Sequence, residues 1–497
     1  MKGARRSLAA PLVLTVIGLG AFITALDQTV VVTAVPSVML DLKIPFSELD
    51  RVSWIVTGYL LGYTVAMPLI GRLGDVYGYS LVYRGALVVF SIGTALVAVS
   101  PNLEWMVAAR VVQAVGGGAT VPIGLAIASS ALPGCQRGMA LGIVIAAAEA
   151  GSMLGPGYGG AIIEFLDWRW IFWLNLPQSA VLFVALGWLP NQRNPGGRVD
   201  YLGGALLVAT LLVLSLALSR QGLFTLSSST PFVIAAPGLA LVGLLVVVEW
   251  RAWQPLLASF LFQSRSFVAA NLTQLLEGVA VIIAMVTVPL MAGTVMGKEP
   301  LTGAMWLLRL TVVIPVGALV GGRLLGTIGV RPVAALGLGM SALGLFLVSG
   351  WDLDITEPWL TVDLAIAGFG FGLNNTPIMT RALESVSEDY RGTAASLVVV
   401  ARMMGMTLGL AALSAWGVEN FQTLTAGLVL PLPEVGEAVG VLETRLAEYN
   451  DRITAAGLSL FHNFFRVAGG VALVAILPAL AMSGGESERE SARKTRR

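Results

Sequence analysis

The sequence predicts an all-α integral membrane protein, and three observations support this fold class. Of its 497 residues, 56% are hydrophobic and only 12% are charged, and the mean hydropathy is +0.83. Apolar stretches of about 20 residues recur along the chain, and a helix of that length crosses ~30 Å of hydrocarbon. Because lipid offers no hydrogen-bond partners to backbone groups, each stretch is expected to be an α-helix.

We expect fourteen transmembrane helices, of which the seventh and eighth read as plain hydrophobic spans. The approximate limits are 10–39, 52–73, 81–100, 104–132, 138–165, 169–190, 201–220, 231–250, 267–296, 301–328, 332–351, 358–382, 393–418 and 457–482. With the N-terminus inside, 19 of the 30 Lys and Arg residues fall in inner loops and tails and 7 in outer loops. Cytoplasmic loops carry such an excess, so we expect both termini in the cytoplasm and the protein in the cell (inner) membrane.

Short motifs recur at a nearly constant distance along the chain. Three pairs of positions differ by 251 to 254 residues: 71–78 with 322–329, 137–155 with 391–409, and Pro36 with Pro289. The repeat predicts duplicated six-helix halves. The expected order is an N-terminal half over 1–190, two bridging helices in 191–265, a C-terminal half over 266–483 and a cytoplasmic tail over 484–497. Two such halves that rock about a central site give alternating access in many secondary transporters.

The composition excludes several classes of protein. With a net charge of +1, the chain lacks the basic excess of a nucleic-acid-binding protein, so we expect no nucleic-acid partner. With one cysteine and one histidine, the chain has no Cys-based metal site and no Ser/His constellation, so we expect no metal, no cofactor and no enzyme. A Gly-Lys-Ser/Thr phosphate loop is also missing, which leaves a proton gradient as the expected energy source.

Five charged residues lie inside apolar spans, where a charge costs at least ~2.5–3.5 kcal/mol. They are Asp27, Glu149, Glu277, Arg309 and Arg402. A chain that carries several such charges is expected to use them, which indicates the passage of protons or ions.

The segment between the second and third spans holds a predicted conformational latch. Gly71 and Gly78 allow a tight turn and close helix approach. Asp75 lies near helix ends, where it can accept backbone N–H bonds and pair with Arg72 or Arg84. Such contacts would hold the inner face shut and break when the halves rock; the alternative is an ordinary turn residue.

Several of these segments resemble signatures of one family. Residues 71–78 resemble the helix 2–3 signature of the major facilitator superfamily, and 151–160 resemble its antiporter signature. Residues 26–32, 168–177 and 200–204 are similar to marks of the fourteen-helix drug:proton antiporter branch. The resemblance covers nearly the whole chain and implies the major facilitator fold, with two pseudo-symmetric halves plus two linker helices.

The antiporter signature on the fifth span is rich in small residues: Gly151, Gly155, Pro156, Gly159 and Gly160. Small residues on one face permit close helix packing, and a proline bends a helix.

A narrower resemblance is to the mycobacterial triacylglyceride exporter subgroup, in segments 54–63, 314–318 and 399–406. It implies a lipid substrate and a lipid-carrying lipoprotein as a possible partner.

The chain departs from the family pattern at three places. Tyr79 and Ser80 stand where the helix 2–3 signature usually carries basic residues. On the fourth span, Arg110 and Gln113 match the usual run, but the glycine that normally follows is displaced. Gly326 replaces the aspartate equivalent to Asp75, so only one half is expected to carry the latch.

The five charges inside the spans receive unequal roles. Asp27 is expected to bind a proton, because burial without a partner favours the neutral carboxyl; a static hydrogen-bonding role is the alternative. Glu149 and Arg402 occupy nearly equivalent positions near the boundary between the halves, and they form either a switchable proton-coupling pair or a static ion pair. Glu277 and Arg309 could line a cavity or pair with each other, and Arg309 is a second possible partner for Glu149.

The longest outer loop, about 419–456, has apolar residues at helical spacing. We expect an outer helical extension continuous with the neighbouring spans, which guides an apolar substrate or docks a carrier protein. The alternative is a solvated amphipathic linker.

Together these features predict a monomeric, proton-coupled exporter of lipids or other apolar molecules. The first alternative is a multidrug:proton antiporter of hydrophobic drugs. A proton-coupled importer of a polar nutrient is disfavoured by the scarcity of polar side chains inside the spans. A membrane enzyme or a passive scaffold is the remaining alternative, from another class.

Overall fold

The computed structural model describes residues 2–44, 52, 54–131, 136–188, 200–219, 240, 241, 243, 244, 247, 248, 259–432 and 439–482. Every regular element in these residues is helical, and all are α-helices except a short 3-10 turn at Glu388–Tyr390. The predicted all-α fold class is therefore confirmed.

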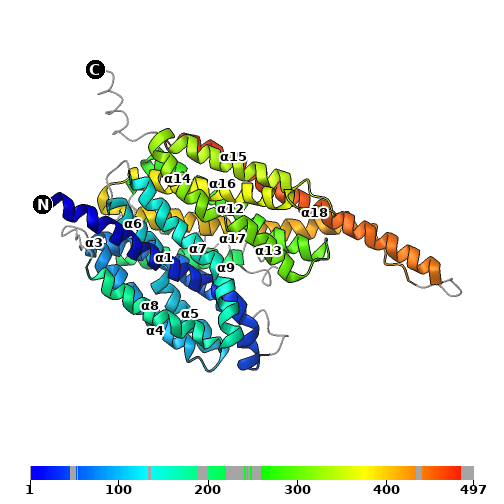
Figure 1. The fold of residues 1–497 in the computed structure, drawn as a ribbon, viewed down its shortest axis with the longest axis horizontal. Helices are drawn as coiled ribbons and strands as arrows, with labels where there is room; N and C mark the ends of the chain where they lie inside the picture. Colours follow the sequence, from blue (N-terminus) through cyan, green and yellow to red (C-terminus); the bar gives the residue numbers. More distant parts are fainter. Residues whose placement is uncertain are drawn as a thin grey trace, which may run out of the picture.

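The helices of the N-terminal half, coloured blue to cyan-green, lie together in one part of the bundle (Figure 1). They are α1 (Lys2–Asp41), α3 (Trp54–Tyr77), α4 (Tyr79–Ala98), α5 (Leu103–Gly117), α6 (Thr120–Ala131), α7 (Arg137–Phe165) and α8 (Arg169–Leu186). Helices α5 and α6 follow each other within the predicted fourth span.

The C-terminal half repeats this order after α9 (Tyr201–Ser219) and the short α11 (Ser259–Gln263). Its helices are α12 (Arg265–Thr294), α13 (Pro300–Thr311), α14 (Ile314–Ile328), α15 (Val330–Val348), α16 (Trp359–Glu384), α17 (Arg391–Thr425) and α18 (Val439–Ala481). Helices α13 and α14 together fill the predicted tenth span.

Eleven candidate spans in the described residues are long and apolar enough to cross a membrane. Helices α9 and α16 occupy two more of the predicted spans. The remaining predicted span, 231–250, and the predicted tail, 484–497, lie mostly or wholly outside the described residues. The structure is therefore consistent with fourteen transmembrane helices.

The two halves pack their helices in the same pairs. The most extensive contacts join α1 to α7 and α4 to α5 in the first half, and α12 to α17 and α15 to α16 in the second. The turns also correspond, because Gly78 and Gly329 have φ angles of 95° and 82° at the α3–α4 and α14–α15 junctions. A side chain with a Cβ rarely adopts such a φ, which explains glycine at both positions.

Glycines let α7 lie directly against α1. A methyl group placed on Gly151, Gly155 or Gly159 would collide with backbone or side-chain atoms of α1, including Thr29. Gly160 is different, because a methyl group there would meet nothing within 4 Å. The expectation of close packing therefore holds for Gly151, Gly155 and Gly159 and is wrong for Gly160.

The two ends of the bundle differ in how the halves meet. We call the end where α1 begins and α18 ends the terminal face, and the opposite end the extension face (Figure 1). At the terminal face one apolar core contains residues of both halves, such as Leu141 with Ile378. Toward the extension face each half has an apolar core of its own, one around Val30 and Phe172 and one around Leu345 and Phe465.

Helix α18 is 43 residues long and projects beyond the rest of the bundle at the extension face (Figure 1). Its projecting part carries an exposed ion pair between Arg452 and Glu448, 2.6 Å apart and one helical turn from each other. Helix α17 also runs on into the predicted outer loop, as far as Thr425. The segment 419–456 is thus helical at both ends, and its residues 433–438 lie outside the described ones.

Candidate functional site

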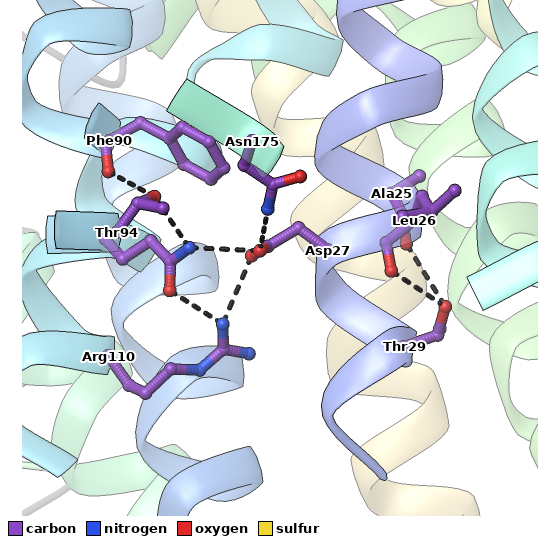
Figure 2. A network of polar contacts seen from close by, with 9 residues as sticks. Ala25, Leu26, Asp27, Thr29, Phe90, Thr94, Arg110 and Asn175 are labelled. Carbon is purple, nitrogen blue, oxygen red and sulfur yellow. Dashed lines mark hydrogen bonds and ion pairs between the residues drawn. The ribbon is translucent and has the colours of Figure 1, made fainter. Parts of the chain in front are cut away.

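Asp27 lies at the centre of a fully buried polar cluster inside the N-terminal half (Figure 2). Arg110 Nη1 donates to its Oδ2 at 3.1 Å, and both Gln113 Nε2 (3.0 Å) and Asn175 Nδ2 (2.6 Å) donate to its Oδ1. The carboxylate comes from α1, and its partners come from α5 and α8. Three donors and one positive charge therefore replace the water that the carboxylate lost.

The arginine of this cluster is also held in place. Arg110 Nη1 donates to Gln113 Oε1 at 2.7 Å, and its guanidinium carbon lies 4.0 Å from the centre of the Tyr59 ring. Gln113 in turn donates to Thr94 Oγ1 at 2.9 Å. Arg110 and Gln113 are three residues apart, so they share one face of α5, from which both side chains reach Asp27.

The expectation that Asp27 lacks a partner is wrong. Arg110 and Gln113 stood out in the sequence only as a family run on the fourth span, and nothing in the sequence gives the rotation of that helix. Asn175 was missed as a partner, although it lies within the motif of 168–177. An unexplained asparagine in an apolar span was the available signal, because a buried amide needs hydrogen-bond partners.

The second ion pair joins the two halves. Arg402 Nη1 of α17 donates to Glu149 Oε1 of α7 at 2.6 Å, and the two side chains are 14% and 19% exposed. Asn375 of α16 donates to the same Glu149 oxygen at 3.4 Å and accepts from Gln274 of α12 at 3.4 Å. The structure thus brings Glu149 and Arg402 together and adds two amides that the sequence reasoning missed.

Glu277 lies beside this pair, but Arg309 does not. The Glu277 side chain on α12 is fully buried, and it interacts electrostatically with Arg402 and Glu149. Arg309 instead forms an ion pair with Glu357, whose side chain is half exposed. The expected pairing of Arg309 with Glu277 or with Glu149 is therefore wrong. Arg309 lies in the first part of its span, close to the connection between α15 and α16 that carries Glu357.

A further contact closes the terminal face. Asp75 Oδ1 accepts from Gly392 N at 2.7 Å, and its Oδ2 accepts from Thr393 N at 2.9 Å and Thr393 Oγ1 at 2.7 Å. Tyr79 adds an O–H bond of 2.7 Å to Oδ1. The two backbone amides belong to the first turn of α17, where the helix dipole favours a negative charge.

The basic residues near this contact have aromatic partners. Arg72 lies over the Tyr390 ring at 4.4 Å, and Arg84 lies over the Phe183 ring at 4.2 Å. The expectation that Asp75 accepts backbone N–H bonds at a helix end matches the geometry. The helix that supplies them, 317 residues further along the chain, was not foreseen.

Among the described residues, no three His, Cys, Asp or Glu side chains are grouped so as to hold a metal ion. The site consists of protonatable and charged side chains on facing helices, which form two ion pairs in this structure.

Residues 17–410 match the model of the Major Facilitator Superfamily. The chain belongs to this superfamily. The triacylglyceride transporter of Mycolicibacterium smegmatis is 35% identical over 95% of this chain and 87% of its own length. That of Mycobacterium tuberculosis is 34% identical over 94% of this chain and 93% of its own.

Solved structures of the superfamily share the fold. The proton:xylose symporter XylE superposes with a TM-score of 0.64 at 14% identity, over 95% of both chains. The human organic anion transporter MFSD10 gives a TM-score of 0.61 at 14% identity, over 95% of this chain and 99% of its own. The resemblance to the superfamily and to its triacylglyceride transporters is confirmed, and the protein is a multi-pass membrane transporter.

Proposed function

We propose that this transporter is a proton-coupled exporter that moves lipids such as triacylglycerides out of the inner membrane by alternating access. The observation that supports it most is the Glu149–Arg402 ion pair, which ties a protonatable group to the contact between the halves. A proton on Glu149 removes the negative charge that holds Arg402, so proton binding weakens one contact between α7 and α17.

Asp27 takes a second role in this scheme, inside one half. Its charge orients donors from α5 and α8, so protonation would loosen α1 from both helices at once. Protons from outside would load Asp27 and Glu149, and their release inside would restore both ion pairs. One proton that enters down ~100 mV supplies ~2.3 kcal/mol, which sustains a substrate gradient of roughly 50-fold.

The lipid substrate rests on the two mycobacterial relatives, which are named triacylglyceride transporters. A multidrug:proton antiporter remains the second candidate, because the antiporter signature on α7 does not discriminate between apolar cargoes. For an importer of polar nutrients, the mostly apolar spans offer few groups that would bind the cargo.

We further propose that the protein works as a monomer with both termini in the cytoplasm, which places the extension face outside. The projecting part of α18 would then guide the lipid away from the membrane or dock a lipid-carrying lipoprotein. Its exposed ion pair between Arg452 and Glu448 also suits a solvated helix that binds nothing.

Transport by purified protein in liposomes tests the proposal. With a fluorescent triacylglyceride, a fluorescent cationic drug and an imposed pH gradient, we expect gradient-driven movement of the lipid. Glu149→Gln should reduce the gradient-driven rate to background, while Arg309→Gln, which changes a charge outside the site, should retain it. Faster movement of the drug than of the lipid would favour the second candidate, and gradient-independent movement would contradict proton coupling.

A further inference from the structure

Glu277 is a buried carboxyl group that the scheme above does not use. It lies on α12 with 0% exposure, and among the described residues no donor forms a hydrogen bond with either of its carboxylate oxygens. Asp27, which is equally buried, has three donors. A buried polar group without a partner is rare and calls for a reason.

Glu277 interacts electrostatically with the positive charge of Arg402, which belongs to the same half and so moves with Glu277 when the halves move. Arg402 lies on α17, which packs on α12 within the same half. The approach is close, because a methyl group on Gly278 would collide with the Arg402 carbonyl, and one on Gly405 with the Leu275 carbonyl. Arg402 interacts electrostatically with both Glu149 and Glu277, and its Nε has no hydrogen-bond partner in the described part of the chain.

Glu149, in contrast, belongs to the other half. When α7 and α17 separate, Arg402 loses the partner it has in this structure. Removing one member of a buried ion pair is strongly destabilising, because the remaining charge is left in a medium of low polarity. A second carboxylate on the same half as Arg402 would keep the arginine paired after separation.

We propose that Glu277 is this second partner, and that Arg402 leaves Glu149 and pairs with Glu277 when the halves part. The proposal rests on the alternating access of the proposed function and adds a positioning residue to it. An exchange of partners keeps Arg402 neutralised in both states. The free energies of the two states therefore stay close enough for the protein to alternate between them.

A double-mutant cycle tests the exchange without substrate or gradient. Thermal unfolding is measured for the full-length wild type, Glu277→Gln, Glu149→Gln and the double variant. Glu277→Gln alone should change the melting temperature little, because Glu277 forms no hydrogen bond in this state. In Glu149→Gln, Glu277 should hold Arg402, so the double variant should lose roughly 5 °C more than the two single losses together.

Two further variants make the cycle specific. Thr287→Val removes a buried hydroxyl from the same helix, where it donates to the Ile283 carbonyl, and it should be additive with Glu149→Gln. Glu277→Asp keeps the carboxylate and should restore part of the loss in the Glu149→Gln background. An additive Glu277→Gln/Glu149→Gln pair would overturn the proposal.

If the double variant does not fold, the cycle is run with Arg402→Gln. Glu277→Gln should then raise the melting temperature, because it removes a carboxyl that has lost its arginine. An equal effect of Glu277→Gln with and without Arg402 would overturn the exchange. The unfolding cycle measures no transport. Absence of proton-driven transport by the wild type in liposomes would therefore refute the proposed function independently of the cycle.

Discussion

The terminal face and the extension face of the bundle differ in what joins the two halves. At the terminal face the halves share one apolar core, and Asp75 of α3 binds the first turn of α17. Toward the extension face the cores are separate, around Phe172 in one half and Phe465 in the other. The Glu149–Arg402 pair joins the halves as a third contact, partly exposed.

This difference shows which contacts a transport cycle has to break. A swing of the halves that opens the terminal face must divide a joint apolar core and remove Asp75 from its three donors on α17. The same swing brings together two cores that are now separate. The charged contacts decide how easily this happens, because apolar burial is not directional whereas hydrogen bonds to a carboxylate are.

The largest expected effect comes from forcing the terminal face apart. In Gly392→Ala, the added methyl group would lie 2.5 Å from the Gly71 carbonyl oxygen. Neither the methyl group nor the backbone oxygen can move away by a side-chain rotation. We expect almost no molecules in which the terminal face is closed. Spin labels at Tyr77→Cys and Ser387→Cys, in a Cys135→Ser background, would report the separation as a longer distance.

Gly160→Ala is the matched control, since its methyl group meets nothing within 4 Å. It should leave the label distance unchanged and stabilise α7 by up to about 1 kcal/mol. Equal distances in Gly392→Ala and Gly160→Ala would contradict the close approach of α3 and α17.

A smaller effect is expected when only the charge of Asp75 is removed. Asp75→Asn keeps the shape but presents an amide N–H₂ to donors such as Gly392 N and Thr393 N. Hydrogen bonds to a charged group are worth about 1.5–3 kcal/mol, so the ratio of closed to open molecules should fall about 10-fold or more. The same label pair measures this ratio, and a ratio equal to that of the wild type would show that Asp75 does not hold the face shut.

The smallest effect is expected on the extension face. Arg309→Gln removes an ion pair with the half-exposed Glu357, and such pairs contribute about 0–1 kcal/mol. The label distances should stay as in the wild type, and so should the melting temperature to within about 2 °C. A clear opening of the terminal face in this variant would mean that charges far from the joint core also set the equilibrium.

The sequence predicted the helices better than it predicted their partners. Span length and hydropathy locate α1, α7 and α17, because the requirement for a helix in lipid is local. The pairing of Asp27 with Arg110 depends on the rotation of two helices about their axes, which hydropathy does not give. Arg309 was misassigned for a related reason, since a position inside an apolar stretch does not reveal how near the side chain lies to the end of the helix.

The motif at 71–78 led to the prediction of a latch, and the repeat led to the prediction of its asymmetry, but neither identified the helix that Asp75 contacts. The 391–409 segment was recognised only as a partner of 137–155, and its role as the first turn of a helix facing α3 required the structure. The pairing of Glu149 with Arg402 could be predicted, because the repeat places the two residues at nearly equivalent positions and so at a similar depth in the two halves.

Because Gly326 stands where the first half has Asp75, the two sides of the joint between the halves are held together differently. At the terminal face the two most extensive contacts between the halves, here called seams, are α3 against α17 and α7 against α14. Asp75 fastens the first seam, whereas the second meets through close glycine contacts, with Gly138 against Gly322. Beside the second seam, Arg137 of α7 and Glu384 of α16 form a longer ion pair of 3.8 Å between partly exposed side chains. Asp75 therefore makes the first seam the more strongly held of the two, and we expect the joint to open first at the second seam.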